Sequence, residues 1–230
     1  MAHRAIENYK LGRKSIMEKD TSVITLMEEN ENYIDKIEYS TNQYLVKVNK
    51  YELSNNELKL SNMLFHSISD IERVGDHCEN LSEIAEQIIR EQTIFSPAAI
   101  KEIELMFNAV EEILETTIEA FEKNDITIAI KVEPLEEVID MLKEAVNSAH
   151  IKRLMAGECL VDTGIHFVEI ATNLERIADH CSNIAFSIIQ FNLPNEELNP
   201  HEYLKELHKK GDRQFDSYFK MYEEKYLLKE

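Results

Sequence analysis

The sequence predicts an all-α protein: a tandem pair of three-helix bundles followed by one extra C-terminal helix. Glycine (5) and proline (4) are scarce among the 230 residues, and 30% of the residues are charged, a composition typical of long helices. Apolar residues recur at steps of three, four and seven, as on the buried stripe of a helix. One nonapeptide occurs twice, at residues 72–80 and 175–183, which indicates a duplicated unit with an offset of 175 − 72 = 103 residues.

Three helices are expected in the first half, residues 1–92. The first runs from about residue 2 to 18, and residues 20–22 supply caps for a second that continues to about residue 49. Ser54 and Glu57 form a capping box that opens the third helix. The third helix carries one apolar stripe: Leu64, Ile68, Ile71, Cys78, Leu81, Ala85 and Ile88.

The second half, residues 96–193, repeats this plan. Ser96 is an N-cap and Pro97 occupies the first helical position, so a helix is expected over residues 97–123. Asn124 and Asp125 interrupt the helix, as Asp20 does in the first half.

A fifth helix is expected to continue to about residue 156, where Gly157 ends it. Pro134 is expected to bend its early turns. A sixth covers about residues 158–191, with these residues facing inward: Phe167, Ile170, Leu174, Ile177, Cys181, Ile184 and Ile188.

The C-terminal extension, residues 194–230, has no counterpart in the first half. Asn199 and Pro200 are expected to start a helix that reaches about Leu228. An aromatic stripe at helical spacing is expected to pack back on the bundles, with a docking face for a partner as the alternative: Phe215, Phe219, Tyr222 and Tyr226.

Charge and cysteine content narrow the class of protein. A net charge of −19 argues against nucleic acid or an anionic membrane surface as the main partner. Three cysteines are too few for a disulfide scaffold, which favours a reducing, cytoplasmic compartment. No run of 18 apolar residues exists, so no membrane span is expected in this chain.

Carboxylates recur in register with the repeat. Each nonapeptide holds a Glu and an Asp four residues apart, which places them one turn apart on one helix face. The second and fifth helices carry a matching element with an offset of 136 − 31 = 105 residues. The candidate metal ligands are therefore Glu31, Asp35, Glu72 and Asp76 in the first half, and Glu136, Asp140, Glu175 and Asp179 in the second.

Pooling four carboxylates between two helices requires compensation. One contact at about 6 Å would cost roughly 3 kcal/mol at an effective dielectric near 20. Protonation, neutralisation by Arg73 or Arg176, or a bound cation would relieve this repulsion, and we favour a cation. Oxygen ligands suit Mg, Ca, Mn or Fe. His77 and His180 would widen the choice to Zn if they were ligands.

These residues resemble the PhoU family, whose third helix reads approximately Asp-Leu-Glu-Arg-Ile-Gly-Asp-His-Ala-x-Asn-Ile-Ala-Glu. The corresponding segments of this sequence are residues 70–83 and 173–185, and the resemblance covers roughly residues 1–192. It implies a cytoplasmic regulator of phosphate uptake and signalling, at the inner face of the membrane through a fused or partner transporter. It also implies multinuclear metal clusters, often of Fe or Zn, on the Glu/Asp-x-x-x-Asp elements. The partners it implies are phosphate transporters and sensor kinases, with self-association to a homodimer as a further possibility.

Two features favour one branch of that family. The segment from His150 to His166 and the extra C-terminal helix resemble the PhoU-like cytoplasmic region of bacterial sodium/phosphate cotransporters. We therefore expect the cytoplasmic domain of such a cotransporter, with a free-standing PhoU-type regulator as the alternative. Asp70 aligns with Asn173, so the two sites are expected to differ in ligand number or occupancy.

Two other classes remain as alternatives. A carboxylate-bridged di-iron enzyme uses Glu-x-x-His on two helices, and no histidine of this chain has a glutamate three residues before it. The expectation is thus a protein that is not an enzyme. A plain helical interaction module, with carboxylates that are only solvated, is the second alternative.

Overall fold

The computed structural model describes residues 1–193 and 213–227, and every regular element in these ranges is helical. None of these helices has both the length and the apolar content needed to cross a membrane. The elements are α1 (Ala2–Glu18), the 3₁₀ turn η1 (Thr21–Val23), α2 (Ile24–Val48), α3 (Asn55–Arg90), α4 (Pro97–Lys123), α5 (Ile126–Ala129), α6 (Val132–Met155), α7 (Val161–Asn192) and α9 (Arg213–Tyr226). The predicted all-α class is confirmed.

Local capping explains where the longest helices begin. The Ser54 side chain accepts the Glu57 backbone N–H at 3.4 Å, while the Glu57 carboxylate accepts the Ser54 N–H at 2.8 Å, so the predicted capping box is confirmed. The Ser96 hydroxyl accepts the Ala99 N–H at 3.2 Å, with proline at the next position. These bonds satisfy N–H groups that have no partner within the helix.

The prediction of one bent helix after Asn124 is wrong. Asp125 caps the short α5 through the Thr127 N–H, and α6 begins only at Val132. Pro134 is the third residue of α6, where its missing N–H removes no intrahelical bond. Continuing α5 through Pro134 would set its ring against the carbonyl four residues earlier. The chain therefore breaks rather than bends.

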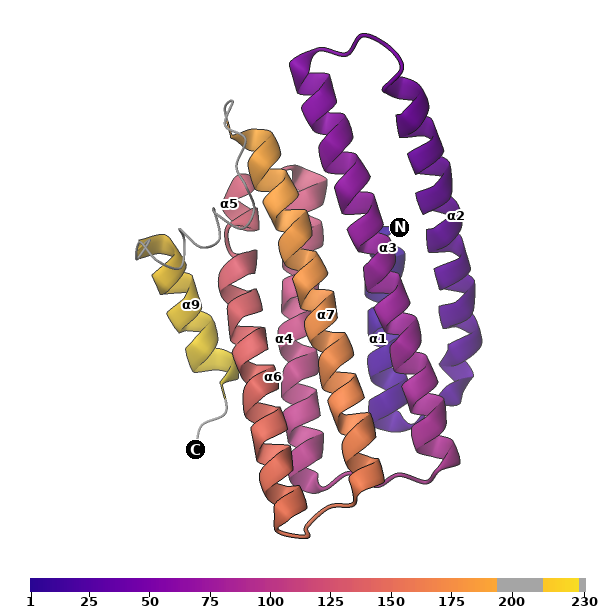
Figure 1. Cartoon of the computed structure of the whole chain (residues 1–230), viewed down its shortest axis with the longest axis vertical. Helices are drawn as coiled ribbons and strands as arrows, with labels where there is room; N and C mark the ends of the chain where they lie inside the picture. The colour runs from indigo at the N-terminus through magenta and orange to yellow at the C-terminus, as the bar shows by residue number, and fades with distance from the viewer. Residues whose placement is uncertain (194–212, 228–230) are drawn as a thin grey trace.

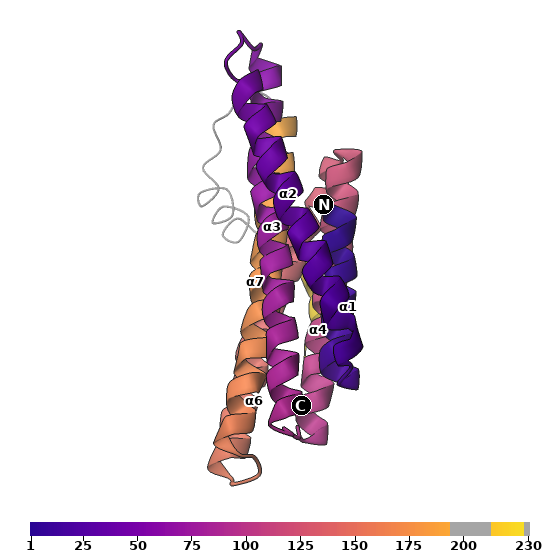
Figure 2. The same ribbon diagram turned by 90° about the vertical axis from the view of Figure 1, so that its right-hand side faces the viewer.

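The two halves pack through their third helices. α3 and α7 lie side by side and run in opposite directions, with α2 on the outer side of α3 and α6 on the outer side of α7 (Figure 1). α1 and α4 lie together on one side of this layer (Figure 2). Tyr9 of α1 is fully buried and donates from its hydroxyl to the Phe107 carbonyl of α4 at 2.6 Å. One continuous apolar core thus runs through both halves.

The cysteines of the two nonapeptides belong to this core. Cys78 and Cys181 are free thiols with no exposed surface. Burial raises the pKa of both thiols, that of Cys181 to about 12. Both are small core residues, as predicted. Because a thiol that stays protonated is a poor metal ligand, neither cysteine is a candidate ligand.

The C-terminal helix α9 packs on α6 and α4 (Figure 1). Tyr222 and Tyr226 are 3% and 4% exposed, and Lys225 forms an ion pair with Glu112 at 2.8 Å. The packing predicted for the aromatic stripe is confirmed for these two tyrosines. The predicted start at Asn199 and Pro200 lies outside the described residues.

Candidate metal centre

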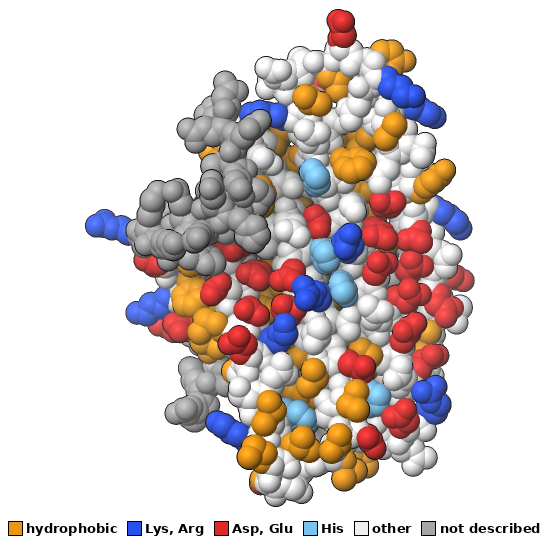
Figure 3. Space-filling model, viewed as in Figure 1, with side chains coloured by type: hydrophobic (Ala, Val, Ile, Leu, Met, Phe, Trp, Pro, Cys, Tyr) orange, Lys and Arg blue, Asp and Glu red, His pale blue; other side chains and the backbone are white. Residues whose placement is uncertain are grey.

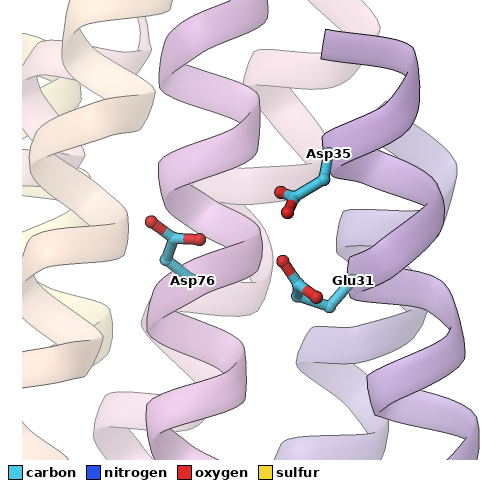
Figure 4. A group of neighbouring side chains, drawn as sticks. All are labelled: Glu31, Asp35 and Asp76. Carbon is cyan, nitrogen blue, oxygen red and sulfur yellow. The ribbon is translucent and has the colours of Figure 1, made fainter. Parts of the chain in front are cut away.

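Three carboxylates converge between α2 and α3 in the first half. Glu31 and Asp35 stand one turn apart on α2, and Asp76 faces them from α3 (Figure 4). One carboxylate oxygen of each lies within 4.8 Å of the other two. Within the described residues, no other trio of His, Cys, Asp or Glu side chains converges in this way.

A glycine lets the two helices approach at this point. Ile34 lies between the two acidic residues of α2 in sequence and is 1% exposed. Its Cδ1 would be 3.3 Å from a Cβ placed on Gly75, the residue before Asp76. The small residue thus admits the Ile34 side chain and brings α2 close to α3, which sets Asp76 opposite Glu31 and Asp35.

The surroundings of this cluster disfavour ionised carboxylates. Burial, then a hydrogen bond with Asp35 and nearby negative charges, raises the pKa of Glu31 to about 7. Burial and the charges of Asp76 and other acids raise the pKa of Glu72 to about 7. Burial followed by Asp35 also raises the pKa of Asp76. A cation would reverse each of these effects, because it favours the anion.

The cluster is larger than the sequence analysis proposed. Glu38 stands close enough to act on Glu72, and Glu79 on Glu31. Two more acids, Glu28 and Glu83, act in turn on Glu79. Burial, then Glu83 and Asp76, raises the pKa of Glu79. Each of the four is three or seven residues from Asp35 or Asp76, the spacing of a single helix face. That spacing was the available signal, and it predicts a site with more than four carboxylates.

The second half contains its own cations. Lys143 of α6 lies 2.9 Å from Glu175, and both side chains are largely buried. Arg176 lies 3.1 Å from Asp179. At Glu136, burial, followed by neighbouring carboxylates that include Asp179, still raises the pKa to about 9. The structure therefore places Asp140 and Asp179 near Glu136, and it places Lys143 beside Glu175.

The nonapeptide histidines join the two halves. The rings of His77 and His180 stack with centroids 5.6 Å apart. Nδ1 of His77 lies 3.0 Å from the Asn173 side-chain oxygen, and Nδ1 of His180 lies 2.9 Å from an Asp70 oxygen. Burial lowers the pKa of His77. Each histidine thus contacts a residue of the opposite half, and the two contacted residues, Asn173 and Asp70, align with each other in the repeat. Neither histidine belongs to the converging trio.

Fold and site define a class: duplicated helical bundles that display carboxylate clusters beside their central helix pair. The family model named PhoU domain matches residues 1–85 and 103–188. The chain belongs to the PhoU family.

Named relatives and solved structures agree with this assignment. The chain is 26% identical over 121 residues to phosphate-specific transport system accessory protein PhoU homolog 1 of Thermotoga maritima, covering 53% of this chain and 51% of the relative. It is 34% identical over 128 residues to the PhoU homolog of Caulobacter vibrioides, covering 56% and 54%. These alignments span about half the length of those relatives. The crystal structure of PhoU from Pseudomonas aeruginosa shares the fold, with a TM-score of 0.78 at 20% identity over 83% of this chain and 91% of that one.

Proposed function

We propose that this protein is a free-standing PhoU-type regulator of phosphate transport that binds a hard metal cation between α2 and α3. The observation that carries the metal site is the convergence of Glu31, Asp35 and Asp76 within 4.8 Å. The raised pKa values around it support the proposal, because burial and neighbouring carboxylates there outweigh the nearby Arg73.

The regulatory role is supported by the named relatives. Those of Thermotoga maritima and Caulobacter vibrioides are accessory proteins of phosphate-specific transport systems. They favour the free-standing regulator over the cotransporter domain that the segment from His150 to His166 suggested. We place the protein in the cytoplasm, at the inner face of the membrane, with a phosphate transporter or a sensor protein as its partner. A homodimer stays a prediction.

The donor set favours oxygen-loving ions. The converging groups are all carboxylates, which suit Mg²⁺, Mn²⁺, Ca²⁺ or Fe. Zn, which the family resemblance also implies, more often takes His or Cys ligands. Glu72 and Glu79 extend the cluster along α3 and would allow more than one ion. A bound cation would supply charge neutralisation, and Glu31, Asp35 and Asp76 would then hold α2 against α3.

The second cluster has a different proposed role. Lys143 already provides a positive charge to Glu175, and Arg176 provides one to Asp179. We propose that these side chains substitute for an ion there, so Glu136, Asp140, Glu175 and Asp179 bind metal more weakly than the first cluster.

Metal binding can be tested with matched variants of the two halves. Protein purified without chelators is analysed for metal, then treated with EDTA and titrated with Mn²⁺ while its melting temperature is recorded. At 100 times the dissociation constant, a bound ion stabilises the fold by about 2.7 kcal/mol. We expect Glu31→Gln with Asp76→Asn to abolish this gain, and the equivalent pair Glu136→Gln with Asp179→Asn to retain most of it. An unchanged melting temperature with EDTA and with Mn²⁺ in the wild type would refute the site.

The regulatory role needs a separate experiment in the host organism. Phosphate uptake is measured in cells that lack this gene and in cells complemented with the wild type or with the Glu31→Gln, Asp76→Asn variant. We expect deregulated uptake that only the wild type restores. Normal uptake in the deletion strain would contradict the role, whatever metal the protein binds.

A further inference from the structure

The end of the α2–α3 hairpin exposes apolar side chains. Val46, Leu58 and Phe65 are 50%, 47% and 41% exposed. In a protein with net charge −19, three such residues within one hairpin end are unexpected for a surface that meets only water.

The same positions are exposed and apolar in the second half. Ile151 of α6 corresponds to Val46 (151 − 46 = 105), while Val161 and Val168 of α7 correspond to Leu58 and Phe65 with an offset of 103. Their exposed fractions are 55%, 63% and 39%. Ile165, one turn after Val161, adds a fourth exposed apolar residue at this end. The repeat thus preserves these exposed apolar positions as well as the core and the paired acidic residues.

These apolar ends share one face with the acidic clusters. Leu58 precedes Asp76 by 18 residues, and Val161 precedes Asp179 by 18 residues. Eighteen residues are five full helical turns and about 27 Å, so each pair points in the same direction. Figure 3 shows this face, with hydrophobic side chains gathered near the two ends of the molecule and most acidic side chains across its middle.

An approximate two-fold axis relates the two ends. His77 contacts Asn173 and His180 contacts Asp70, and exchanging the two halves converts one contact into the other. The axis therefore passes through the seam between α3 and α7, where these helices run antiparallel (Figure 1).

We propose that this face docks a two-fold symmetric protein homodimer, with one apolar end of the chain seated on each identical subunit. A homodimer with the same symmetry presents two equal recesses, one from each identical subunit, to the two ends. Lys47 and its counterpart Lys152 are exposed beside the apolar residues, so each recess is expected to be rimmed by carboxylates. The partner surface between the recesses is basic, because it faces the acidic clusters.

Charge decides against the two other occupants. A second copy of the chain placed face to face sets acidic cluster against acidic cluster, because each cluster has more carboxylates than positive charges to offset them. An anionic bilayer pressed on the same face sets negative lipid head groups against the acidic clusters. At contact these charges lie within the Debye length of about 8 Å at physiological ionic strength, so salt does not remove the repulsion.

The test compares variants of each end. The tagged chain captures its partner from host cells, native mass spectrometry gives the stoichiometry, and the purified partner is used for affinity measurements. The end variants are Leu58→Glu with Phe65→Glu, and Val161→Glu with Val168→Glu. The control is Met221→Glu on α9, which changes a residue of similar exposure, 47%. Circular dichroism checks the fold, and serine replaces glutamate in any variant that unfolds.

We expect one chain per two identical partner subunits. Loss of either end removes bivalent binding and should weaken the affinity by about 100-fold or more, by similar factors for the two ends, while Met221→Glu changes it by less than about twofold. Failure to capture a homodimer, or an affinity insensitive to one end, overturns the proposal. So does a dimer of the chain itself in sedimentation equilibrium that the end variants dissociate. Binding to phosphatidylglycerol/phosphatidylethanolamine vesicles that depends on the same residues also overturns it. The inference needs no bound cation, so its failure leaves the metal site intact.

Discussion

The two acidic clusters occupy equivalent places in the duplicated fold, but three acids of the first are replaced in the second. Glu38 corresponds to Lys143 (143 − 38 = 105), Glu79 to Ser182 (182 − 79 = 103) and Glu83 to Phe186 (186 − 83 = 103). Lys143 pairs with Glu175, and Ser182 donates a hydrogen bond to Glu133. The second cluster thus has a cation, a hydrogen-bond donor and a phenyl ring where the first has three more carboxylates.

This difference separates two solutions to one electrostatic problem. Both halves keep a Glu-x-x-x-Asp element on each of two adjacent helices, and both must offset the repulsion among them. In the second half, Lys143 and Arg176 of the chain itself supply part of the offset. In the first half Arg73 offsets the repulsion only in part, and the pKa values of Glu31 and Glu72 rise to about 7, which is the condition of a site that an external cation would relieve. In the second half Glu136 shares this condition, with its pKa raised to about 9.

Exchanging the residue types at Lys143 and Glu38 should have the largest effect on stability. Lys143→Glu leaves Glu175, which is 8% exposed, without its partner and adds a charge beside it. Removing one member of a buried ion pair is strongly destabilising, so we expect a loss of about 3 kcal/mol in the free energy of unfolding, measured with urea in EDTA. Added Mn²⁺ should recover part of this loss, because the second cluster then carries an acid in place of its lysine, as the first does at Glu38.

The reciprocal variant serves as the control. Glu38→Lys places a cation in the first cluster, so it should raise the stability of the metal-free protein slightly and weaken Mn²⁺ binding at least tenfold. Unchanged Mn²⁺ affinity in Glu38→Lys, or a stable Lys143→Glu protein that ignores Mn²⁺, would remove the distinction between the clusters.

Much of this comparison was predictable from the sequence, and the remainder depends on packing. The repeat revealed all eight paired carboxylates, since their spacing alone places each pair on one helix face. Lys143 is visible three residues after Asp140, but its choice of Glu175 on α7 depends on how α6 and α7 dock. The sequence left open whether His77 and His180 are metal ligands, because it does not show that His77 contacts Asn173 of the opposite half. Pro134 was recognised as a disruption, but whether the helix bends or breaks depends on the residues that pack around it.

The pH dependence of stability should show the second largest effect. Glu31 and Glu72 have pKa values near 7 in the folded protein against about 4.3 when unfolded. Between these values the folded state binds more protons, so metal-free stability should fall as pH rises through this window. Discounted for the solvent exposure of both groups, the fall is about 2 kcal/mol between pH 5 and 8. Urea midpoints in EDTA measure it.

Variants of the two halves should affect different parts of this pH range. Glu31→Gln with Glu72→Gln should flatten the curve up to about pH 7. Glu136→Gln should flatten the part that continues toward pH 9, since the pKa of Glu136 is raised to about 9. Saturating Mn²⁺ should stabilise the wild type most above pH 7, where the ligands ionise readily. A stability that rises between pH 5 and 8 without metal would contradict the assignment of strained carboxylates to the first cluster.

The smallest effect concerns the glycine that brings α2 to α3. Gly75 corresponds to Ala178 in the second half (178 − 75 = 103), where α6 and α7 pack with alanine in place. A Cβ on Gly75 would lie 3.3 Å from Cδ1 of Ile34, the far end of a flexible side chain. Because alanine is a better helix former than glycine by about 0.5–1 kcal/mol, Gly75→Ala should stabilise the metal-free protein by about 0.5 kcal/mol in urea unfolding. The added methyl group also contacts Cγ2 of Ile34 at 3.6 Å, so part of the adjustment should fall on the turn that carries Glu31 and Asp35, and the variant should bind Mn²⁺ a few-fold more weakly. Unchanged Mn²⁺ affinity in a stabilised variant would show that the first cluster does not need the close approach of these helices.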